Sequence, residues 1–590
     1  MPPSPPPRAR RALPTVLTLA AVAVLAAGGA LWWRENQVSR VRASLPAPPA
    51  AVPTPTLGAL LGKAQAGAAR GSLEAVAELG RLYHANEFRR EAEACWRLLI
   101  RAQPDEARWH YYLADLLRMT GDQAAVEQQL ALTVAADPKA ASAWLQLAEM
   151  QFKTGRLDAA EAGYARRVEL LPNDPYAELG LARIAQLRSR TDETLTRLER
   201  LLQQHPKFSA AHNLYAELQA AAGREELADL HRWLGREAGR FREADDPWME
   251  ELNARCHEPR RLCHLGVVAY QTGQGDRGKA RFEKAIALAP GDPLAYELLG
   301  SLLLEQESAA TAREVLIRGL DQAKDAAPSP LHFLKLNEAC RVLNQPTAAR
   351  EALTAGLNRY PDSPDLLHAE GNQLKLDGQP AEAAAAYRKA LALNPSAVET
   401  DFALAILLLE TGRREDAVQA LNHALSMQPT FPKAMLLLAR LEMDAGRFDA
   451  AGGHLLRLLK ANPGSPEIRQ ITARWRLQAG RAVERSDPAA AERHYRAGLA
   501  LQSEHPDLNA SLGLQLLIGD RAAEAVPLLE IYQRAQPANP QAALFLGQAY
   551  ARSGRMPDAR RILTDGLRQA EHAGQTALAG HLREILSALR

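Results

Sequence analysis

Residues 141–174 read ASAWLQLAEMQFKTGRLDAAEAGYARRVELLPND, and this stretch decides the fold. Its first half places apolar residues at helical spacing, at Trp144, Leu147, Ala148 and Phe152. Gly155 then marks the end of a first helix, because glycine readily takes the positive φ found just past a helix. A second apolar stripe runs to Pro172, which ends the second helix because proline has no N–H. The stretch predicts two antiparallel helices joined by short turns.

The same unit recurs along most of the chain. A small residue returns at a step of 34 residues, at Gly80, Ala114, Ala148, Ala182 and Ala216. A proline keeps this step, first at Pro104, Pro138, Pro172 and Pro206 and later at Pro361, Pro395, Pro429 and Pro463. The small residues are expected where the two helices cross, since a large side chain there would push their axes apart. One helix pair cannot bury its apolar faces alone, so the copies must stack into a solenoid.

These residues resemble the tetratricopeptide repeat (TPR) family, with matches at Trp144, Leu147, Ala148, Ala160, Tyr164 and Pro172. The resemblance covers residues 73–573, in roughly fourteen copies. It implies an all-α fold, a right-handed superhelix of helix–turn–helix repeats. It also implies that the first helix of each repeat lines a concave groove that binds other proteins.

Interruptions in the 34-residue step divide the chain. We expect a first TPR block at residues 73–242 with about five repeats, a connector at 243–258, and a second block at 259–573 with about nine repeats. Residues 574–590 predict a single capping helix, which covers the last apolar face of a solenoid. Ahead of the repeats we expect a disordered basic segment (1–11), a membrane helix (12–33), and a Pro/Ala-rich linker with a lead-in helix (34–72).

The membrane prediction rests on residues 12–33, an uncharged run that follows Arg8, Arg10 and Arg11. As a helix this run is ~33 Å long, against a hydrocarbon core of ~30 Å. Trp32 and Trp33 close it, as is typical of the membrane interface. A cleaved signal peptide is the alternative, but the length and the tryptophans favour a retained anchor. The linker that follows is expected to be a semi-extended spacer.

The orientation of this anchor depends on a narrow balance. Three arginines precede the run, and Arg34, Arg40 and Arg42 follow it, so only the terminal amine favours an inside N-terminus. That orientation puts the TPR array outside the cytoplasm, which is the periplasm if the source is a Gram-negative bacterium. The localisation we expect is therefore the inner (cytoplasmic) membrane, with a single span.

Composition and motifs argue against catalysis and nucleic-acid binding. The 71 basic residues nearly balance 69 acidic ones, whereas a phosphate-binding surface would show a basic excess. Residues 273–280, GQGDRGKA, mimic a nucleotide-binding loop, but such loops follow a strand and this stretch follows a helix. The repeat register makes it the turn between two helices, with Gly278 at the crossing. We predict no enzyme activity, no cofactor and no small-molecule substrate.

The four cysteines are Cys95, Cys256, Cys263 and Cys340. Cys95 and Cys340 fall within helical stripes and are expected to be small buried groups. Cys256-His257 and Cys263-His264 allow three interpretations: free thiols, a disulfide, or a zinc site. The spacing matches no zinc module, so we predict no metal site and favour free thiols.

The connector is acidic around one tryptophan. Asp245, Asp246, Glu250 and Glu251 surround Trp248. They could grip a basic partner, but we favour a solvated linker in which Trp248 fills the gap between the two blocks.

Family groove positions can be transferred to this chain one repeat at a time. In the later copies the predicted partner-binding residues are Phe402, Ile406, Leu409, Lys433, Leu436, Arg440 and Met443. They form an apolar strip edged by two cations, suited to an extended segment or an amphipathic helix with acidic ends. The early copies offer a more polar set, Arg108, Tyr111, Asp115 and Arg118. A TPR subgroup that grips C-terminal carboxylates is not supported, because His368 and Asn372 lack the accompanying lysine.

The function expected from this sequence is a membrane-tethered, non-enzymatic TPR scaffold or adaptor for protein partners in the cell envelope. The alternative is the same architecture facing the cytoplasm, as an adaptor that regulates an envelope-biogenesis enzyme.

Overall fold

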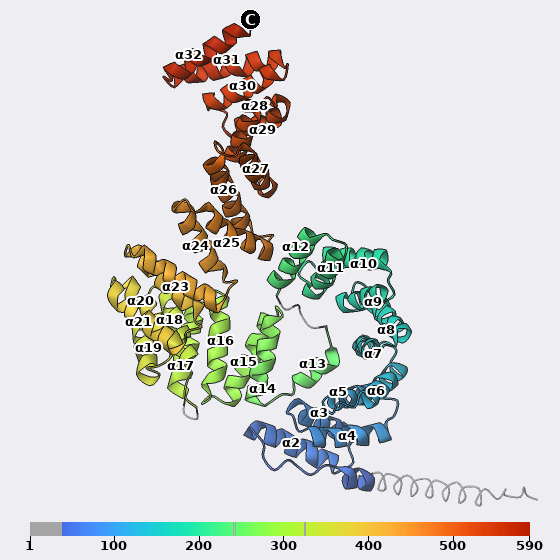
Figure 1. The fold of residues 1–590 in the computed structure, drawn as a ribbon. Coiled ribbons are helices and arrows are strands. Elements are labelled where there is room, and N and C mark those ends of the chain that lie inside the picture. The colour runs from blue at the N-terminus through green and yellow to red at the C-terminus, as the bar shows by residue number, and fades with distance from the viewer. Residues whose placement is uncertain (1–37, 240, 242–243, 324–325, 590) are drawn as a thin grey trace, which may run out of the picture. The chain divides into compact units, whose positions relative to one another are not determined.

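The computed structural model describes residues 38–239, 241, 244–323 and 326–589, and every regular element in these residues is helical. The helices form two compact units (Figure 1). Unit 1 comprises residues 1–211 and 238–356, and unit 2 comprises residues 212–237 and 357–590. Five helix pairs run from α3 to α12 and nine from α14 to α31, with α13 between them. The expected all-α solenoid of stacked helix pairs is confirmed for the described residues.

The helices of unit 1 are α2 (Pro55–Ala68), α3 (Leu73–Ala85), α4 (Arg89–Ala102), α5 (Ala107–Arg118), α6 (Gln123–Ala136), α7 (Ala141–Lys153), α8 (Leu157–Leu170), α9 (Pro175–Leu187), α10 (Thr191–Gln204), α13 (Pro247–Asn253), α14 (Pro259–Gln271), α15 (Gly275–Leu288), α16 (Pro293–Glu305), α17 (Ala309–Gln322), α18 (Pro330–Val342) and α19 (Pro346–Arg359). The last turn of α19 crosses into unit 2.

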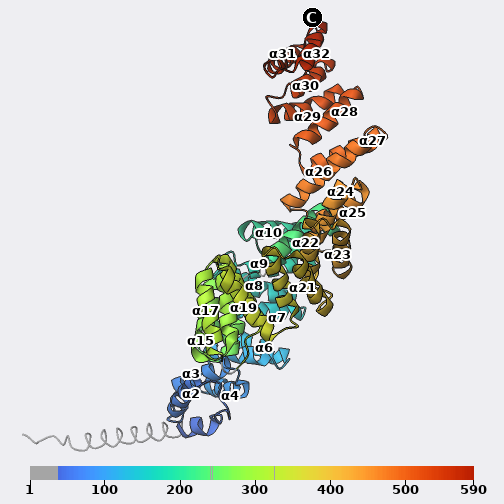
Figure 2. The same ribbon diagram turned by 90° about the vertical axis from the view of Figure 1, so that its left-hand side faces the viewer.

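The helices of unit 2 are α11 (Ser209–Ala221), whose first turn belongs to unit 1, α12 (Glu225–Glu237), α20 (Pro364–Leu376), α21 (Pro380–Leu393), α22 (Val398–Glu410), α23 (Arg414–Met427), α24 (Pro432–Asp444), α25 (Phe448–Ala461), α26 (Pro466–Val483), α27 (Pro488–Leu501), α28 (Pro506–Ile518), α29 (Ala522–Ala535), α30 (Pro540–Arg552), α31 (Met556–His572) and α32 (Thr576–Ala588). From α26 to α32 the helices follow one another as a stack in both views (Figure 2).

Small residues allow the close approach of helices both within a pair and between neighbouring repeats. A Cβ added to Gly180 would lie 2.4 Å from the ring of Tyr164, a fully buried side chain of the preceding repeat. A Cβ on Gly278 would lie 2.9 Å from the carbonyl oxygen of Gly266 on the partner helix. Gly273 lies in the turn between α14 and α15 with φ at 78°. The GQGDRGKA stretch therefore begins in the helix–helix turn, at residues 273–274, and continues as the start of α15.

Deviations from the repeat have structural counterparts. Helix α26 spans 18 residues, whereas the neighbouring first helices α24 and α28 span 13, so the copy that begins near Pro466 has a longer first helix. Asn337 replaces the small residue of its copy, and its buried amide donates to the carbonyl of Ala349 at 2.8 Å. The predicted capping helix is present as α32, where Ala579 and Leu582 are buried.

The predicted membrane helix, residues 12–33, lies outside the described residues. Among the described helices none is both long and apolar enough to cross a bilayer. The linker differs from the extended spacer expected. Val41 is buried, Leu45 and Val52 pack against the core of unit 1, and Gln65 of α2 donates to the carbonyl of Pro46 at 3.3 Å. These three apolar residues fold the linker back onto the first helices.

Candidate partner-binding surfaces

The first helices of the early repeats hold a segment of the chain itself. This segment is the described part of the connector, residues 244–258, which includes the short helix α13. It lies against α3, α5 and α7 of unit 1, and its contacts include Tyr111, one of the early groove residues predicted from the TPR resemblance. The surface that these three helices form is called the inner face below.

The connector crosses the repeats in reverse order. Just ahead of it, Phe241 packs on Phe208 and on Tyr176 of α9, with ring centroids 4.6 and 6.2 Å apart. The carbonyl of Asp245 accepts a hydrogen bond from Ser142 of α7 at 3.1 Å. Trp248 then meets α5, and the residues after it meet α3. An inner face that binds a chain running across successive repeats is how a peptide ligand would be held.

The carboxylate of Asp246 accepts hydrogen bonds from two repeats and from the connector itself. The phenol of Tyr111 in α5 donates to its Oδ2 atom, and the amide of Gln146 in α7 donates to the same oxygen at 3.4 Å. Its Oδ1 atom caps α13 by accepting from the N–H of Met249 at 3.1 Å. Burial raises the pKa of Asp246, while the Tyr111 hydrogen bond opposes that rise. Burial, together with the charge of Asp246, also raises the pKa of Tyr111, so the phenol stays protonated as a donor.

Trp248 packs on the same tyrosine. Its ring meets Tyr111 edge-on, with centroids 5.1 Å apart, and its carbonyl accepts from the hydroxyl of Tyr112 at 3.2 Å. Edge-to-face aromatic pairs stabilise a contact beyond their buried area. Trp248 therefore contacts the first block directly and does not merely fill a gap between blocks.

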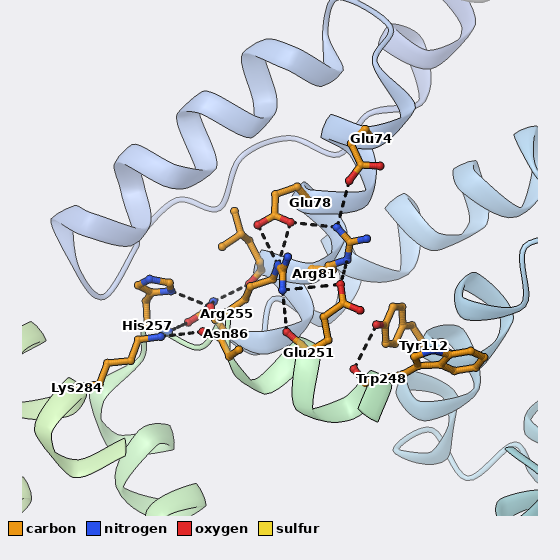
Figure 3. A network of polar contacts seen from close by, with 12 residues as sticks. Glu74, Glu78, Arg81, Asn86, Tyr112, Trp248, Glu251, Arg255, His257 and Lys284 are labelled. Carbon is orange, nitrogen blue, oxygen red and sulfur yellow. Dashed lines mark hydrogen bonds and ion pairs between the residues drawn. The ribbon is translucent and has the colours of Figure 1, made fainter. Parts of the chain in front are cut away.

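A network of charged groups joins the end of α13 to α3 (Figure 3). Glu251 faces Arg81 at 3.2 Å, and Arg255 donates to both oxygens of Glu78 at 2.9 and 3.0 Å. Arg81 is only 4% exposed. A guanidinium so deeply buried requires carboxylate partners, and the connector supplies one of them.

The backbone of the connector is held as well. The side chain of Asn86, at the end of α3, donates to the carbonyl of Arg255 at 3.0 Å and accepts from the N–H of His257 at 2.6 Å. These two hydrogen bonds fix the backbone of the connector, in the way that peptide-binding proteins bind the backbone of an extended ligand. Leu252 and Cys256 are fully buried in the core beside them.

Three of the contacting residues occupy one register position. Glu78, Tyr112 and Gln146 follow one another at the 34-residue step, and each touches the connector. Repetition of contacts at one position of successive repeats is the signature of a shared binding face.

The far side of the connector meets α15. Arg277 and Arg281 each lie 3.2 Å from Glu250, and Lys284 donates to the carbonyl of Ala254 at 2.8 Å. A polar cavity of about 520 Å³ adjoins the connector, lined by residues that include Asp115, Arg118 and Asp246. The solvated linker predicted from the acidic composition is thus wrong, because Asp246, Glu250 and Glu251 are engaged by other parts of unit 1.

The predicted partner-binding residues of the later copies lie on α22 and α24 of unit 2. Phe402, Ile406, Leu409, Leu436 and Met443 are partly buried, whereas Lys433 and Arg440 are exposed. Phe402 meets Phe431 edge-on, with centroids 6.0 Å apart, and Leu436 and Met443 pack on the core around Ala439. The strip is therefore half-exposed apolar surface on neighbouring first helices.

Both cations of this strip have partners within the chain. Lys433 lies 2.9 Å from Glu399 of α22, and Arg440 lies 3.2 Å from Glu467 of α26. All four side chains are more than half exposed, so these ion pairs contribute little to stability. A carboxylate of a partner could replace Glu399 or Glu467 at small cost.

The carboxylate-clamp positions are used internally. His368 lies 3.0 Å from the hydroxyl of Thr400, and Asn372 accepts from the hydroxyl of Tyr387 at 2.7 Å.

All four cysteines are buried free thiols. Burial raises the pKa of Cys263 to about 12 and also raises the pKa of Cys256. Within the described ranges no three His, Cys, Asp or Glu side chains gather as a metal ion requires. Neither the disulfide nor the zinc interpretation is seen at Cys256 and Cys263.

Comparison with protein families identifies the repeats. Two family models described as tetratricopeptide repeat match this chain. One matches residues 77–132, 123–178, 264–328, 402–466, 476–540 and 519–573, more than half of the chain. The other matches residues 374–426. A comparison with curated proteins finds no match.

Solved structures are similar at low identity. The crystal structure of the APC/C hetero-tetramer Cut9-Hcn1 is 14% identical over 80% of this chain and 96% of that chain, with a TM-score of 0.28. Yeast Tom70 is 14% identical over 71% and 96%, with a TM-score of 0.27. Pseudomonas aeruginosa pilF is 20% identical over 37% and 97%, with a TM-score of 0.31. These likenesses concern the helical-repeat fold alone.

Proposed function

Because the chain belongs to the tetratricopeptide repeat family, we propose that it is a non-enzymatic scaffold or adaptor that binds protein segments on the first helices of its repeats. We further propose that residues 12–33 tether it to the inner membrane, with the array on the periplasmic side of the cell envelope. The uncharged run and its closing tryptophans support the tether.

One observation carries the binding proposal. The inner face of unit 1 holds a polypeptide segment, and its key contacts have equivalents in unit 2. Tyr111, Phe402 and Leu436 each stand three residues before the small crossing residue of their copies. Arg81 and Arg440 each directly follow that residue. The strip on α22 and α24 therefore has the positions that bind the connector in unit 1, with apolar side chains in place of Tyr111.

Capture of partners from detergent-solubilised membranes tests this proposal. The full chain carrying Phe402→Glu and Leu436→Glu should lose a partner that the unaltered chain recovers, because two carboxylates would stand on the apolar strip. A matched control carries Glu415→Gln and Asp416→Asn on the second helix α23, away from the strip. Equal recovery by all three folded chains would remove this strip from consideration.

Reporter fusions after Arg590 test the orientation. Alkaline phosphatase folds to an active form only after export, so an active fusion supports the periplasmic array. An inactive phosphatase fusion together with a fluorescent cytoplasmic reporter fusion would overturn the periplasmic orientation and favour the cytoplasm-facing adaptor. Equal numbers of arginines on the two sides of residues 12–33 are compatible with that orientation as well.

A further inference from the structure

We propose that the inner face of α3, α5 and α7 is a second protein-binding site, which the connector occupies as a built-in ligand. The external partner that fits it is a short acidic segment with an aromatic residue, of the pattern Asp-Pro-Trp followed three residues later by Glu. This inference does not depend on the strip in unit 2.

The chemistry of the contacts defines that partner. One carboxylate is recognised by Tyr111 and Gln146, and a second carboxylate by Arg81. An aromatic ring between them meets the edge of Tyr111. Asn86 and Glu78 bind Arg255, at the end of the connector that stays in place, and take no part in binding the external segment. The groups that recognise the two carboxylates and the ring belong to the repeats, so the inner face carries the recognition whether the ligand is tethered or separate.

The N-terminal half of the connector is held by polar groups and by Trp248 and Met249, which pack on the core but are only partly buried. Residues up to Glu251 make hydrogen bonds, ion pairs and one aromatic contact, whereas the buried apolar anchors, Leu252 and Cys256, come at the end. The adjoining cavity of about 520 Å³ reaches Asp246 and Met249. The N-terminal half can therefore leave the inner face while Leu252 and Cys256 stay in the core.

An external segment must compete with the connector, which is part of the same chain as the inner face. A tethered segment acts at an effective concentration in the millimolar range, so an external segment of the same sequence competes at a disadvantage. If the connector covers the site ~99% of the time, the apparent affinity for the external segment falls ~100-fold. Loosening the connector should restore that affinity.

The test uses a fluorescein-labelled peptide of residues 244–251 and the purified full chain, with binding followed by fluorescence anisotropy. In the loosened chain, Asp246→Ala and Trp248→Ala weaken the connector and leave the inner face intact. We expect this chain to bind the peptide at least ~10-fold more tightly than the unaltered chain does. The matched control is Asp245→Ala, because the Asp245 side chain is exposed and only its carbonyl meets the surface. It should behave as the unaltered chain.

Additional peptides and variants test the binding site if one variant of the chain folds poorly. A peptide with Asp246→Ala should fail to bind the loosened chain, and a peptide with Asp245→Ala should bind. Adding Arg81→Gln and Tyr111→Phe to the loosened chain should abolish binding. In the unaltered chain, excess peptide should speed amide hydrogen exchange in α13 while α5 and α7 keep their protection.

Three results would overturn the proposal. One is equal peptide affinity of the loosened and unaltered chains, with helix content preserved. Another is binding of the Asp246→Ala peptide as tight as that of the parent peptide. The third is concentration-dependent dimerisation of the loosened chain by light scattering, which would make a second copy of this chain the occupant.

Discussion

Removal of one hydroxyl group, by Tyr111→Phe, should loosen the connector without disturbing the repeats. Tyr111 is fully buried, and its ring packs against Trp248 and Tyr112. Phenylalanine keeps the ring and its packing. It removes the donor to Asp246 and the acceptor for Gln146.

The magnitude follows from the partners that remain. A hydrogen bond to a charged group contributes ~1.5–3 kcal/mol. Asp246 keeps its bonds from Met249 and Gln146 and borders the polar cavity, so we expect the lower part of this range, ~2 kcal/mol. Since ~1.4 kcal/mol is a factor of ten, α13 should open ~30-fold more often.

Amide hydrogen exchange in residues 248–253 measures this opening, because exchange of a protected amide follows the free energy of local opening. The control is Tyr112→Phe, which removes a neutral hydrogen bond to the Trp248 carbonyl and should change exchange ~5-fold. Exchange in α7 and α8 should not change in either variant. The reasoning is refuted if Tyr111→Phe leaves exchange in α13 unaltered, or if α5 and α7 lose protection together with α13.

Two further predictions concern stability. Arg167 is buried with two guanidinium nitrogens unpaired, and its third nitrogen binds Asp174, which also caps α9. Asp174→Ala should therefore cost ~4–6 kcal/mol in local stability, because it leaves the buried guanidinium without a carboxylate and removes the helix cap. Arg167→Met should cost less than half of that. Hydrogen-exchange protection of α8 and α9 measures both losses, and an equal loss in the two variants would contradict this account. His332 is fully buried, with its Nε2 atom 2.8 Å from the carbonyl of Leu316, and burial lowers its pKa from 6.5. As the pH falls below 6.5, the unfolded chain takes up more protons at this histidine than the folded chain does, so the hydrogen-exchange protection of α17 and α18 should decline. His332→Gln should make this decline smaller. An unchanged pH profile in that variant would show that His332 is not the source of the decline.

The repeat register was readable from the sequence because it is set by local packing. Each small crossing residue and each proline acts within its own helix pair, so the spacing alone placed the turns and the final α32. The same register removed the nucleotide-loop interpretation at residues 273–280, where Gly278 is needed for the approach of α15 to Gly266. Local rules of this kind require no knowledge of distant contacts.

The linker and the connector were misjudged because both depend on contacts that lie far apart in the chain. Pro- and Ala-rich composition predicted an extended linker, but Val41, Leu45 and Val52 found apolar surface on the first helices. Four acidic residues predicted a solvated connector, but Glu251 lies beside Arg81 and His257 beside Asn86, which is 171 residues earlier. Composition alone cannot distinguish a carboxylate that faces water from one that faces a buried guanidinium.

A clue to the occupied face was nevertheless present in the repeats. A first-helix position that only packs against its neighbours favours apolar residues, yet the early copies place Arg81 and Tyr111 at such positions, both of them buried. Burying a guanidinium or a phenol is costly unless a partner group arrives to satisfy it. Polar residues at inner positions of the early copies therefore indicate a polar segment bound there. The later copies place Phe402 and Leu436 at the position of Tyr111, where they are only partly buried. By the same reasoning these copies favour a ligand that covers them with an apolar side chain.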